Sequence, residues 1–273
     1  MFELILACLV VLLYIVSTIG YIIYVFKNEM VYARFGRYSM FVAFILQLLI
    51  ISARLYRIGN FPIATIFDSV TFFVMVMVAI YLAIEVKTRL FVLGAFIASI
   101  GLIFTLFSLP FYRDVSPLPP VLKSYWFPIH AVSSFIGEAA FGVSFMLSIA
   151  YLIQERELRS KRFSFILKRL PPITKLDELN YNIIKIGFIF MTLGIITGSI
   201  WAHYAWGSFW SWDPKETWSL ITWLIYAAIL HARITAGWRG RRAAWLSIVG
   251  FISVMFLFLG VNMLLPGLHT YAR

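Results

Sequence analysis

Residues 183–236 read IIKIGFIFMTLGIITGSIWAHYAWGSFWSWDPKETWSLITWLIYAAILHARITA, which is two long apolar runs joined by a segment rich in tryptophan. Each run holds about 20 residues, and a helix of that length crosses the ~30 Å hydrocarbon core of a bilayer. We therefore predict membrane-spanning helices over 183–203 and 217–236, with a loop over 204–216 between them.

Similar apolar runs recur along the whole chain, in which 62% of the residues are hydrophobic and only 13% are charged. This composition is typical of an integral membrane protein built from helices. We predict an all-α fold, a polytopic bundle of about eight transmembrane helices. The expected spans are 2–26, 38–56, 67–86, 90–109, 128–153, 183–203, 217–236 and 244–265.

The gaps between these spans are short. The third and fourth spans are joined so closely that they should form a helical hairpin. The longest gap, 154–182, holds only twenty-nine residues, which leaves no room for a soluble domain. We therefore treat 1–273 as a single integral membrane domain, with the loop 204–216 as its distinctive segment.

The lysines and arginines are distributed unevenly over the two sets of loops. The loops and helix ends after the first, third, fifth and seventh spans carry seventeen of the 23 basic residues, and the other side carries six. Because cytoplasmic loops hold the excess of positive charge, we expect both termini and the tryptophan-rich loop on the extracytoplasmic side. The same asymmetry accounts for the net charge of +11. It indicates attraction to anionic lipid and no nucleic-acid partner.

The tryptophans are concentrated in one place. Six of the nine lie between Trp201 and Trp223, whereas an ordinary aromatic belt spreads tryptophan over many helix ends. The charged and turn-forming run 213–216, DPKE, lies in the same segment. Large flat apolar side chains are thus mixed with charge at one membrane surface. Such a surface suits a large planar ligand with charged edges.

The four histidines are the scarce chemical groups of this chain. His130 opens the fifth span and His269 follows the eighth, so both are expected at the surface that holds the tryptophan-rich loop. Two imidazoles from separate helix ends can supply both axial ligands of a haem, although histidine is also an ordinary residue at a membrane edge. His203 is interpreted as a helix-end residue.

His231 differs because it lies inside the membrane. It follows Asp213 by eighteen residues, which at ~1.5 Å per residue places it ~27 Å deeper, near the cytoplasmic end of the seventh span. An ionisable side chain at depth is a functional candidate, usually facing the bundle or a polar cavity. The alternative is a histidine near the inner interface that is hydrogen-bonded to a carbonyl.

Two carboxylates and three cations also lie in or beside the spans. Glu138 is expected roughly 12 Å inward from the start of the fifth span, where it needs a polar partner or a proton. Asp68 opens the third span and suits a helix N-cap. Lys215, Arg54 and Arg57 are candidates to pair with ligand carboxylates, and snorkelling to the membrane surface is an equally good explanation for each.

The run WGSFWSWDPKETW, residues 206–218, followed by SLITWLIYAAILHAR, resembles the tryptophan-rich WWD signature of haem-handling proteins. Relatives of the CcmC and CcmF type share the WGxxWxWD core. The DPKETW continuation is more similar to the CcsA/ResC type of the system II cytochrome c maturation pathway.

The resemblance extends over most of the chain. His130, His231 and His269 fall where that family has three histidines, and Arg54 falls where it has an arginine. FPIATIFDS, residues 61–69, is similar to the family's proline followed by an acidic-serine pair before the third span. Two departures are visible: residues 63–68 match only loosely, and GEAAF has Glu138 where an aromatic residue is expected.

The resemblance implies a complex with a ResB/CcsB-type membrane partner, which moves haem b from the cytoplasmic side to the outer face and joins it to apocytochrome c. His130 and His269 would ligate the haem iron at the outer face. His231 would belong to an earlier haem site whose other ligand comes from the partner. The residues expected to contact haem are Trp206, Trp210, Trp212, Asp213 and Trp218, together with these three histidines.

The implied reaction is addition of two cysteine thiols of a CxxCH segment across the haem vinyl groups, so the chain would be a component of a cytochrome c synthase, or haem lyase. The protein's part is mostly positioning, and no general acid is assigned. Asp213 is expected to orient the loop by hydrogen bonds. The membrane would be a plasma (inner) membrane or a thylakoid membrane.

Three other functions remain open from the sequence. A CcmC-like haem handler that loads a haem chaperone is separated only by motif details. An electron-transfer cytochrome b ordinarily pairs histidines inside the bilayer, and only His231 is at depth here. A solute transporter would be expected to show internal repeats or broken helices, and no convincing repeat is present.

Overall fold

A computed structural model describes residues 2–63, 65–115, 119–161 and 167–268 of the chain. Within these ranges the fold is all-helical, and eight helices are long and apolar enough to cross a membrane. The protein is therefore an integral membrane protein, as predicted. The helices are α1 (Phe2–Lys27), α2 (Met30–Ile58), α3 (Ile66–Thr88), α4 (Phe91–Ser108), α5 (Trp126–Arg159), α6 (Ile173–Trp206), α7 (Pro214–Thr235) and α8 (Arg241–Met255).

Shorter helical segments complete the chain. α8 continues through one π-helical turn, Phe256–Gly260, into α9, Val261–Leu264. In the described parts of the connections, three 3-10 turns are present, at Leu109–Phe111, Pro120–Leu122 and Leu167–Arg169.

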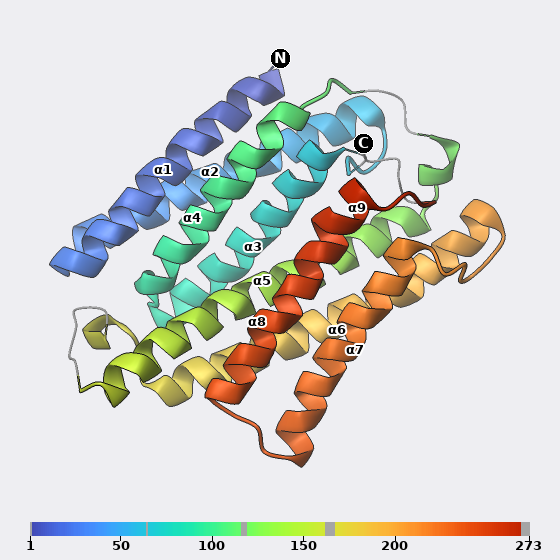
Figure 1. The fold of residues 1–273 in the computed structure, drawn as a ribbon. Helices are drawn as coiled ribbons and strands as arrows, with labels where there is room; N and C mark the ends of the chain where they lie inside the picture. The colour runs from blue at the N-terminus through green and yellow to red at the C-terminus, as the bar shows by residue number, and fades with distance from the viewer. Residues whose placement is uncertain (1, 64, 116–118, 162–166, 269–273) are drawn as a thin grey trace.

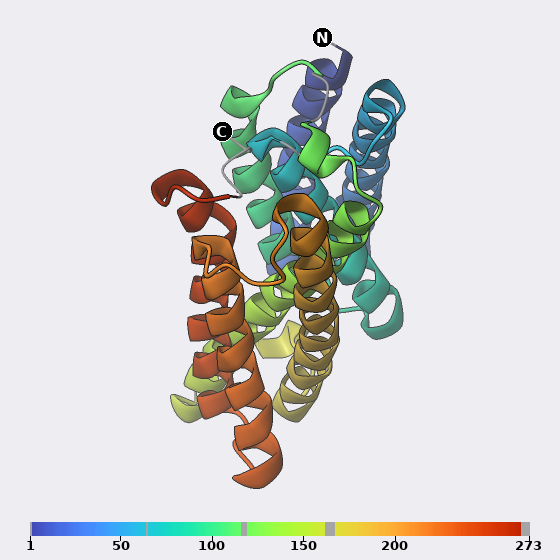
Figure 2. The same ribbon diagram turned by 90° about the vertical axis from the view of Figure 1, so that its right-hand side faces the viewer.

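The connections alternate between the two ends of the bundle, so α1 begins and α9 ends at the end that carries the α6–α7 loop (Figure 1). We call this the tryptophan-loop end. α5 is the central helix and packs against α3, α4, α6 and α8. In Figure 2 the C-terminal helices α7 and α8 lie on one side of the molecule and α1 and α2 on the other. α3 and α4 form the predicted hairpin, with Arg89 in the left-handed conformation at its turn.

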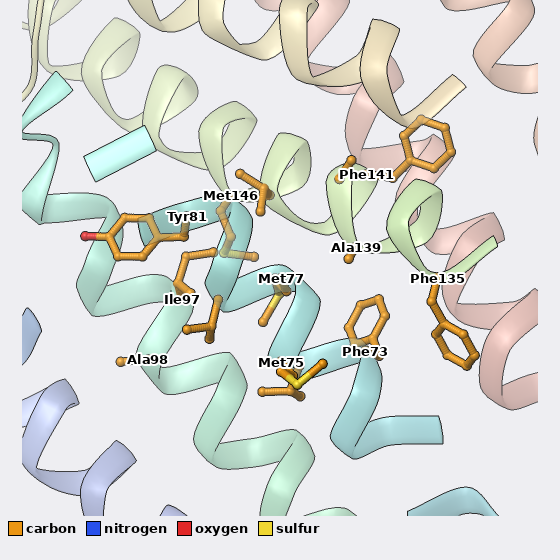
Figure 3. Close-up of a cluster of buried hydrophobic side chains, with 14 of the residues drawn as sticks. Phe73, Met75, Met77, Tyr81, Ile97, Ala98, Phe135, Ala139, Phe141 and Met146 are labelled. Carbon is orange, nitrogen blue, oxygen red and sulfur yellow. The ribbon is translucent and has the colours of Figure 1, made fainter. Parts of the chain in front are cut away.

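The apolar core extends through the bundle, and α3, α4 and α5 contribute many of its buried residues. Figure 3 shows Phe73, Met77 and Tyr81 of α3 facing α4 and α5, with Ile97 and Phe141 from those helices in the same cluster. All five side chains are completely buried. Close packing of these buried side chains holds α5 in position against its neighbouring helices.

Close packing of α5 against α6 depends on glycine. A Cβ atom at Gly137 would lie 2.9 Å from the backbone nitrogen of Met191, and one at Gly194 would lie 2.5 Å from Ser134 Oγ. Small residues allow the backbones of membrane helices to approach closely where lipid provides no hydrophobic drive for association. The two helices therefore form one tightly packed pair, and their register is fixed by backbone contact.

Both helices that flank the tryptophan loop are longer than the sequence pattern predicted. α6 extends to Trp206 and is closed by Gly207 in the left-handed conformation (φ 79°). α7 starts at Pro214, because Asp213 is its N-cap and Glu216 completes a capping box. Apolar patterning marks only the part of a helix within lipid, whereas caps mark its true ends. The connection is thus 207–213, shorter than the expected 204–216.

An ion pair joins α2 to α3 at the tryptophan-loop end. Arg54 and Asp68 are both 1% exposed, and Arg54 Nε lies 2.5 Å from Asp68 Oδ1. Arg54 also donates to the carbonyl of Arg113, at 3.1 Å. The predicted N-cap role of Asp68 is wrong, because Thr65 is the N-cap and accepts from the Asp68 backbone N–H. Asp68 lies one turn further in, where it neutralises a buried cation.

Arg57 lies nearby in a more exposed ion-pair network. Its guanidinium donates to Glu3 at 2.6 Å and to Asp114 at 2.8 Å. The Val115 backbone N–H and then Arg57 hold the pKa of Asp114 below its ordinary value. Arg57 therefore ties α1, α2 and the α4–α5 connection together at this end of the bundle.

Candidate functional site

The tryptophan loop is a short, internally bonded turn. The Ser211 backbone N–H donates to Glu216 Oε2 at 2.7 Å, and Ser208 Oγ donates to the Trp210 carbonyl at 2.8 Å. Trp212 has a positive φ of 59° and is 71% exposed. Non-glycine residues with positive φ are uncommon, and such conformations concentrate at functional sites. The loop thus holds one indole outward from the surface.

The remaining predicted tryptophans lie at different depths around the loop. Trp210 packs edge-on to Trp212, with ring centroids 5.8 Å apart, and Trp206 packs edge-on to the buried Trp201 at 5.0 Å. Trp218 lies on α7 and contacts Phe256 of the π-helical turn, at 4.3 Å between centroids. The loop and its two helix ends therefore carry three separate pairs of packed aromatic rings.

His130 lies on the second turn of α5, against α6. Its Nδ1 is 2.7 Å from the carbonyl oxygen of Gly194, and its ring is nearly parallel to that of Trp201, with centroids 5.9 Å apart. A Cβ atom at Gly198 would lie only 2.5 Å from Nδ1. The imidazole can lie against α6 because this position is glycine.

The contact with Gly194 determines which nitrogen of His130 can bind a metal. A carbonyl oxygen only accepts hydrogen bonds, so Nδ1 carries the proton and the lone pair is on Nε2. Histidine ligands of metals characteristically donate their other ring N–H to a carbonyl or carboxylate, which fixes the tautomer and the ring orientation. His130 thus makes the kind of hydrogen bond to a backbone carbonyl that metal-binding histidines commonly make through their other ring nitrogen.

A cavity lies directly beneath the loop and beside His130. It offers about 110 Å³ to the centres of water molecules, which is room for several of them. Its wall mixes apolar and polar groups from six segments of the chain. The polar and charged lining residues are Ser69, His130, Ser134, Glu138, Ser199, Lys215, Glu216, Ser219 and Asn262, and Phe209 and Trp210 contribute to the wall from the loop.

Lys215, Glu138 and Glu216 are the lysine and the two carboxylates among the described residues that line this cavity. Lys215 Nζ donates to Asn262 Oδ1 at 3.1 Å. Glu138 is 8% exposed, and among the described residues no hydrogen-bond donor or ion-pair partner contacts its carboxylate. His130, Ser134 and Glu138 share one face of α5 at four-residue spacing, so the cavity follows that face inward.

Asp213 connects the loop to the C-terminal segment. Its Oδ1 accepts from the Lys215 backbone N–H at 3.0 Å, and its Oδ2 accepts from the Leu268 backbone N–H at 2.6 Å. The expected structural role of Asp213 therefore includes a contact that the sequence did not indicate. His269, the predicted second ligand, lies outside the described residues, so its pairing with His130 stays a prediction.

The other two histidines lie away from the cavity. His203 stacks on Phe209, with ring centroids 4.3 Å apart and an angle of 4° between the planes, and its side chain is exposed. His231 is exposed near the far end of α7. It follows Lys215 by sixteen residues, which corresponds to ~24 Å along the helix. The structure therefore does not bring His231 together with His130.

Some residues of the site were missed by sequence reasoning. Asn262 lies in an apolar run, and its direction into the cavity depends on the preceding π-helical turn. Gly194 and Gly198 carry no chemistry of their own. The spacing of His130, Ser134 and Glu138 at i, i+4 and i+8 was a usable signal, because it places three polar groups on one helical face.

Comparison with known proteins gives a consistent result. Residues 63–269 match the model of a family described as "Cytochrome C assembly protein". The chain is 39% identical over 244 residues to the cytochrome c biogenesis protein CcsA of Chlamydomonas reinhardtii, covering 86% of this chain and 67% of that protein. It is 38% identical over 281 residues to the CcsA of Synechococcus elongatus, covering 86% of each.

The fold also resembles a solved structure, that of the cytochrome c haem lyase CcmF. The TM-score is 0.62 at 17% sequence identity, and the match covers 99% of this chain and 51% of that one. At this identity the likeness describes the fold only. It indicates that the whole eight-helix bundle is similar in fold to about half of a larger protein.

Proposed function

The chain belongs to the cytochrome c assembly family, with relatives of the CcsA type, and serves cytochrome c maturation; from this premise we propose that it holds haem b beneath the tryptophan loop for attachment to apocytochrome c. The observation that carries this proposal is the hydrogen bond from His130 Nδ1 to Gly194, because it makes Nε2 the ring nitrogen that would bind a metal.

In this proposal His130 and His269 are the two axial ligands of the haem iron. Leu268, which directly precedes His269 in the sequence, is bonded to Asp213 at the start of α7. α7 lines the same cavity as His130. Two histidine ligands would hold the iron in the site and tune its redox potential. The rings of Trp210, Trp212 and Trp218 supply flat apolar surface for the macrocycle.

The chemistry that this arrangement supports is thioether formation. Each cysteine S–H of a CxxCH segment adds across one haem vinyl group, so that sulfur bonds to one vinyl carbon and hydrogen to the other. No atom is lost and no external reductant enters this balance. The protein contributes by holding both partners in reach, which turns an encounter into an effectively intramolecular step. The chain thereby acts as a component of a cytochrome c synthase.

His231 supports a second part of the proposal, a haem site shared with a ResB/CcsB-type subunit. Its imidazole is exposed on α7, on the same helical face as the exposed residues Leu224 and Ala228. Within the described residues no hydrogen bond to its ring is present. An ionisable group on an apolar membrane face requires a polar partner. We assign that partner to haem and to a ligand from the second subunit.

The proposed orientation places the tryptophan loop on the extracytoplasmic side. It rests on the excess of lysine and arginine at the opposite end of the bundle, where anionic lipid headgroups bind basic residues. We assign the protein to a plasma (inner) or thylakoid membrane from its similarity to CcsA-type relatives. Cysteine accessibility to a membrane-impermeant reagent at Trp212 and at Arg239 would place the two ends on their sides.

The deciding experiment is the reduced absorbance and pyridine haemochrome spectrum of the purified protein, alone and with its ResB-type partner. We expect a low-spin b-type haem that is lost in a His130→Ala/His269→Ala variant, and covalent cytochrome c when the partner and an apocytochrome are co-expressed. Absence of haem from both preparations under haem-replete expression would contradict the proposal. Haem binding without covalent product would instead favour a protein that loads a chaperone.

A further inference from the structure

We propose that Lys215 is the counter-ion of one haem propionate and that the cavity beneath the loop receives this charged edge of the macrocycle. The inference rests on the proposed function and deepens it, because it assigns the orientation of haem in the site. It follows from the placement of charge around the cavity.

Lys215 is the cation best placed for this role. It is the single lysine or arginine among the described residues that line the cavity, and His130, on the same wall, would be occupied as an iron ligand. A snorkelling lysine directs its ammonium group to the membrane surface. Lys215 instead turns inward and donates to Asn262 of α9. Its ammonium group has two further N–H donors available for a ligand.

The other two candidate cations have partners of their own. Arg54 is buried against Asp68 and the Arg113 carbonyl. Arg57 is bonded to Glu3 and Asp114. Neither arginine lines the cavity. Of these three candidate cations, Lys215 is therefore the one that lines the cavity, and its hydrogen-bond partner, Asn262, is neutral.

Glu138 adds a carboxylate to the cavity wall. Its carboxylate is 8% exposed and has no hydrogen-bond donor among the described residues, although its charge and that of Lys215 attract each other across the cavity. A buried carboxylate without a hydrogen bond is costly to retain. We interpret Glu138, together with the nearby Asp213, as the negative charge that balances Lys215 when no ligand carboxylate is present. A propionate entering the site takes over that role.

Two consequences distinguish this arrangement from a purely structural one. Removing the Lys215 charge should weaken binding of haem but not of a haem whose propionates are esterified. Removing the Glu138 charge should strengthen haem binding, because the competing carboxylate and its repulsion of a propionate are both lost. A structural role for either residue predicts weaker binding of both ligands alike.

The experiment is an absorbance titration of the purified protein with ferric haem b and, separately, with its propionate dimethyl ester. The wild-type chain should bind haem about 10- to 100-fold more tightly than the diester, which is the range of a charge-assisted hydrogen bond. Lys215→Met should reduce this preference to near unity, and Lys215→Arg should restore most of it. The exposed Lys123, changed to Met, is the matched control and should keep the full preference.

The possible outcomes distinguish an error in the role of Lys215 from an error in the proposed function. If the wild-type protein binds haem through His130 but binds the diester equally well, the role of Lys215 is wrong and the proposed function stands. If Lys215→Met keeps the preference, the propionate lies elsewhere. If the wild-type protein binds neither ligand, the proposed function itself fails, and the inference with it. The wild-type comparison needs no variant, so equal binding of haem and the diester would overturn the assignment even if Lys215→Met failed to fold.

Discussion

Asp213 Oδ2 accepts a hydrogen bond of 2.6 Å from the backbone N–H of Leu268, so the N-cap residue of α7 also holds Leu268 in place. The same carboxylate caps α7 through Lys215 N. A Cβ atom at Gly267 would lie 2.4 Å from Oδ2, so only glycine permits this approach. One side chain thus joins the tryptophan loop, the start of α7 and the segment that leads to His269.

Asp213→Ala should therefore reduce both stability and haem binding. Loss of the cap costs about 0.5–2 kcal/mol, and loss of the charge-assisted bond to Leu268 costs about 1.5–3 kcal/mol. Thermal unfolding in detergent and the haem spectrum measure the two effects. Thr65→Ala removes the N-cap of α3 at the same end of the bundle. It should lower stability without changing haem binding per folded molecule, and an equal loss in both variants would contradict the role of Asp213.

Gly198→Ala should displace the His130 ring. The added methyl group would lie 2.5 Å from Nδ1, so the bond to the Gly194 carbonyl cannot persist with its present geometry. We expect loss of the low-spin haem spectrum while the helical circular dichroism signal is retained. Gly142→Ala is the matched control on α5, because its nearest neighbour would be 3.3 Å away. A normal spectrum in Gly198→Ala would show that the orientation of His130 is not required.

The buried pair of Arg54 and Asp68 should be a determinant of stability and not of haem binding. Arg54→Gln leaves an uncompensated buried carboxylate, which costs about 3–5 kcal/mol. We expect poor yield and a lowered midpoint of unfolding, with normal haem content in the fraction that folds. Arg57→Gln, on the more exposed neighbour, should have a much smaller effect on yield. Loss of haem from the folded fraction of Arg54→Gln would indicate instead that Arg54 contacts the ligand.

His231→Ala should affect only the protein in complex with its partner. The imidazole is exposed on α7, and no hydrogen bond within the described residues depends on it. The isolated chain should therefore keep its stability and its His130-dependent haem, whereas the co-purified complex should lose one haem. Leu224→Ala, on the same face of α7, provides the control. Equal haem content in wild-type and His231→Ala complexes would rule out the shared site.

The sequence predicted the eight spans, because hydropathy over ~20 residues is a local property. It also predicted the α3–α4 hairpin from the shortness of its connection. Helix ends were less predictable. Aspartate is common at N-caps, which favoured Asp68. In the structure Thr65 is the N-cap of α3, and the Asp68 carboxylate forms an ion pair with Arg54. The partner of a buried charge depends on tertiary packing and cannot be read from one segment alone.

The candidate site was only partly predictable for the same reason. His130 and the tryptophans were found from their type and position. The cavity between them was not, because it needs α5, α7 and α9 to be placed in three dimensions. The π-helical turn at Phe256–Gly260 changes the direction of every residue after it, including Asn262. One extra residue per turn leaves no pattern in an apolar run.

The packing of α5 against α6 has a consequence for how a macrocycle reaches the cavity. These helices touch backbone to backbone at Gly137 and Gly194, so separating them would break many contacts at once. α7, in contrast, buries only Thr222, Tyr226 and Ile229. The α5–α6 side of the cavity is therefore rigid, whereas the α7 side is more easily displaced. We expect entry and release of the macrocycle to proceed by movement of α7, the helix that also carries His231.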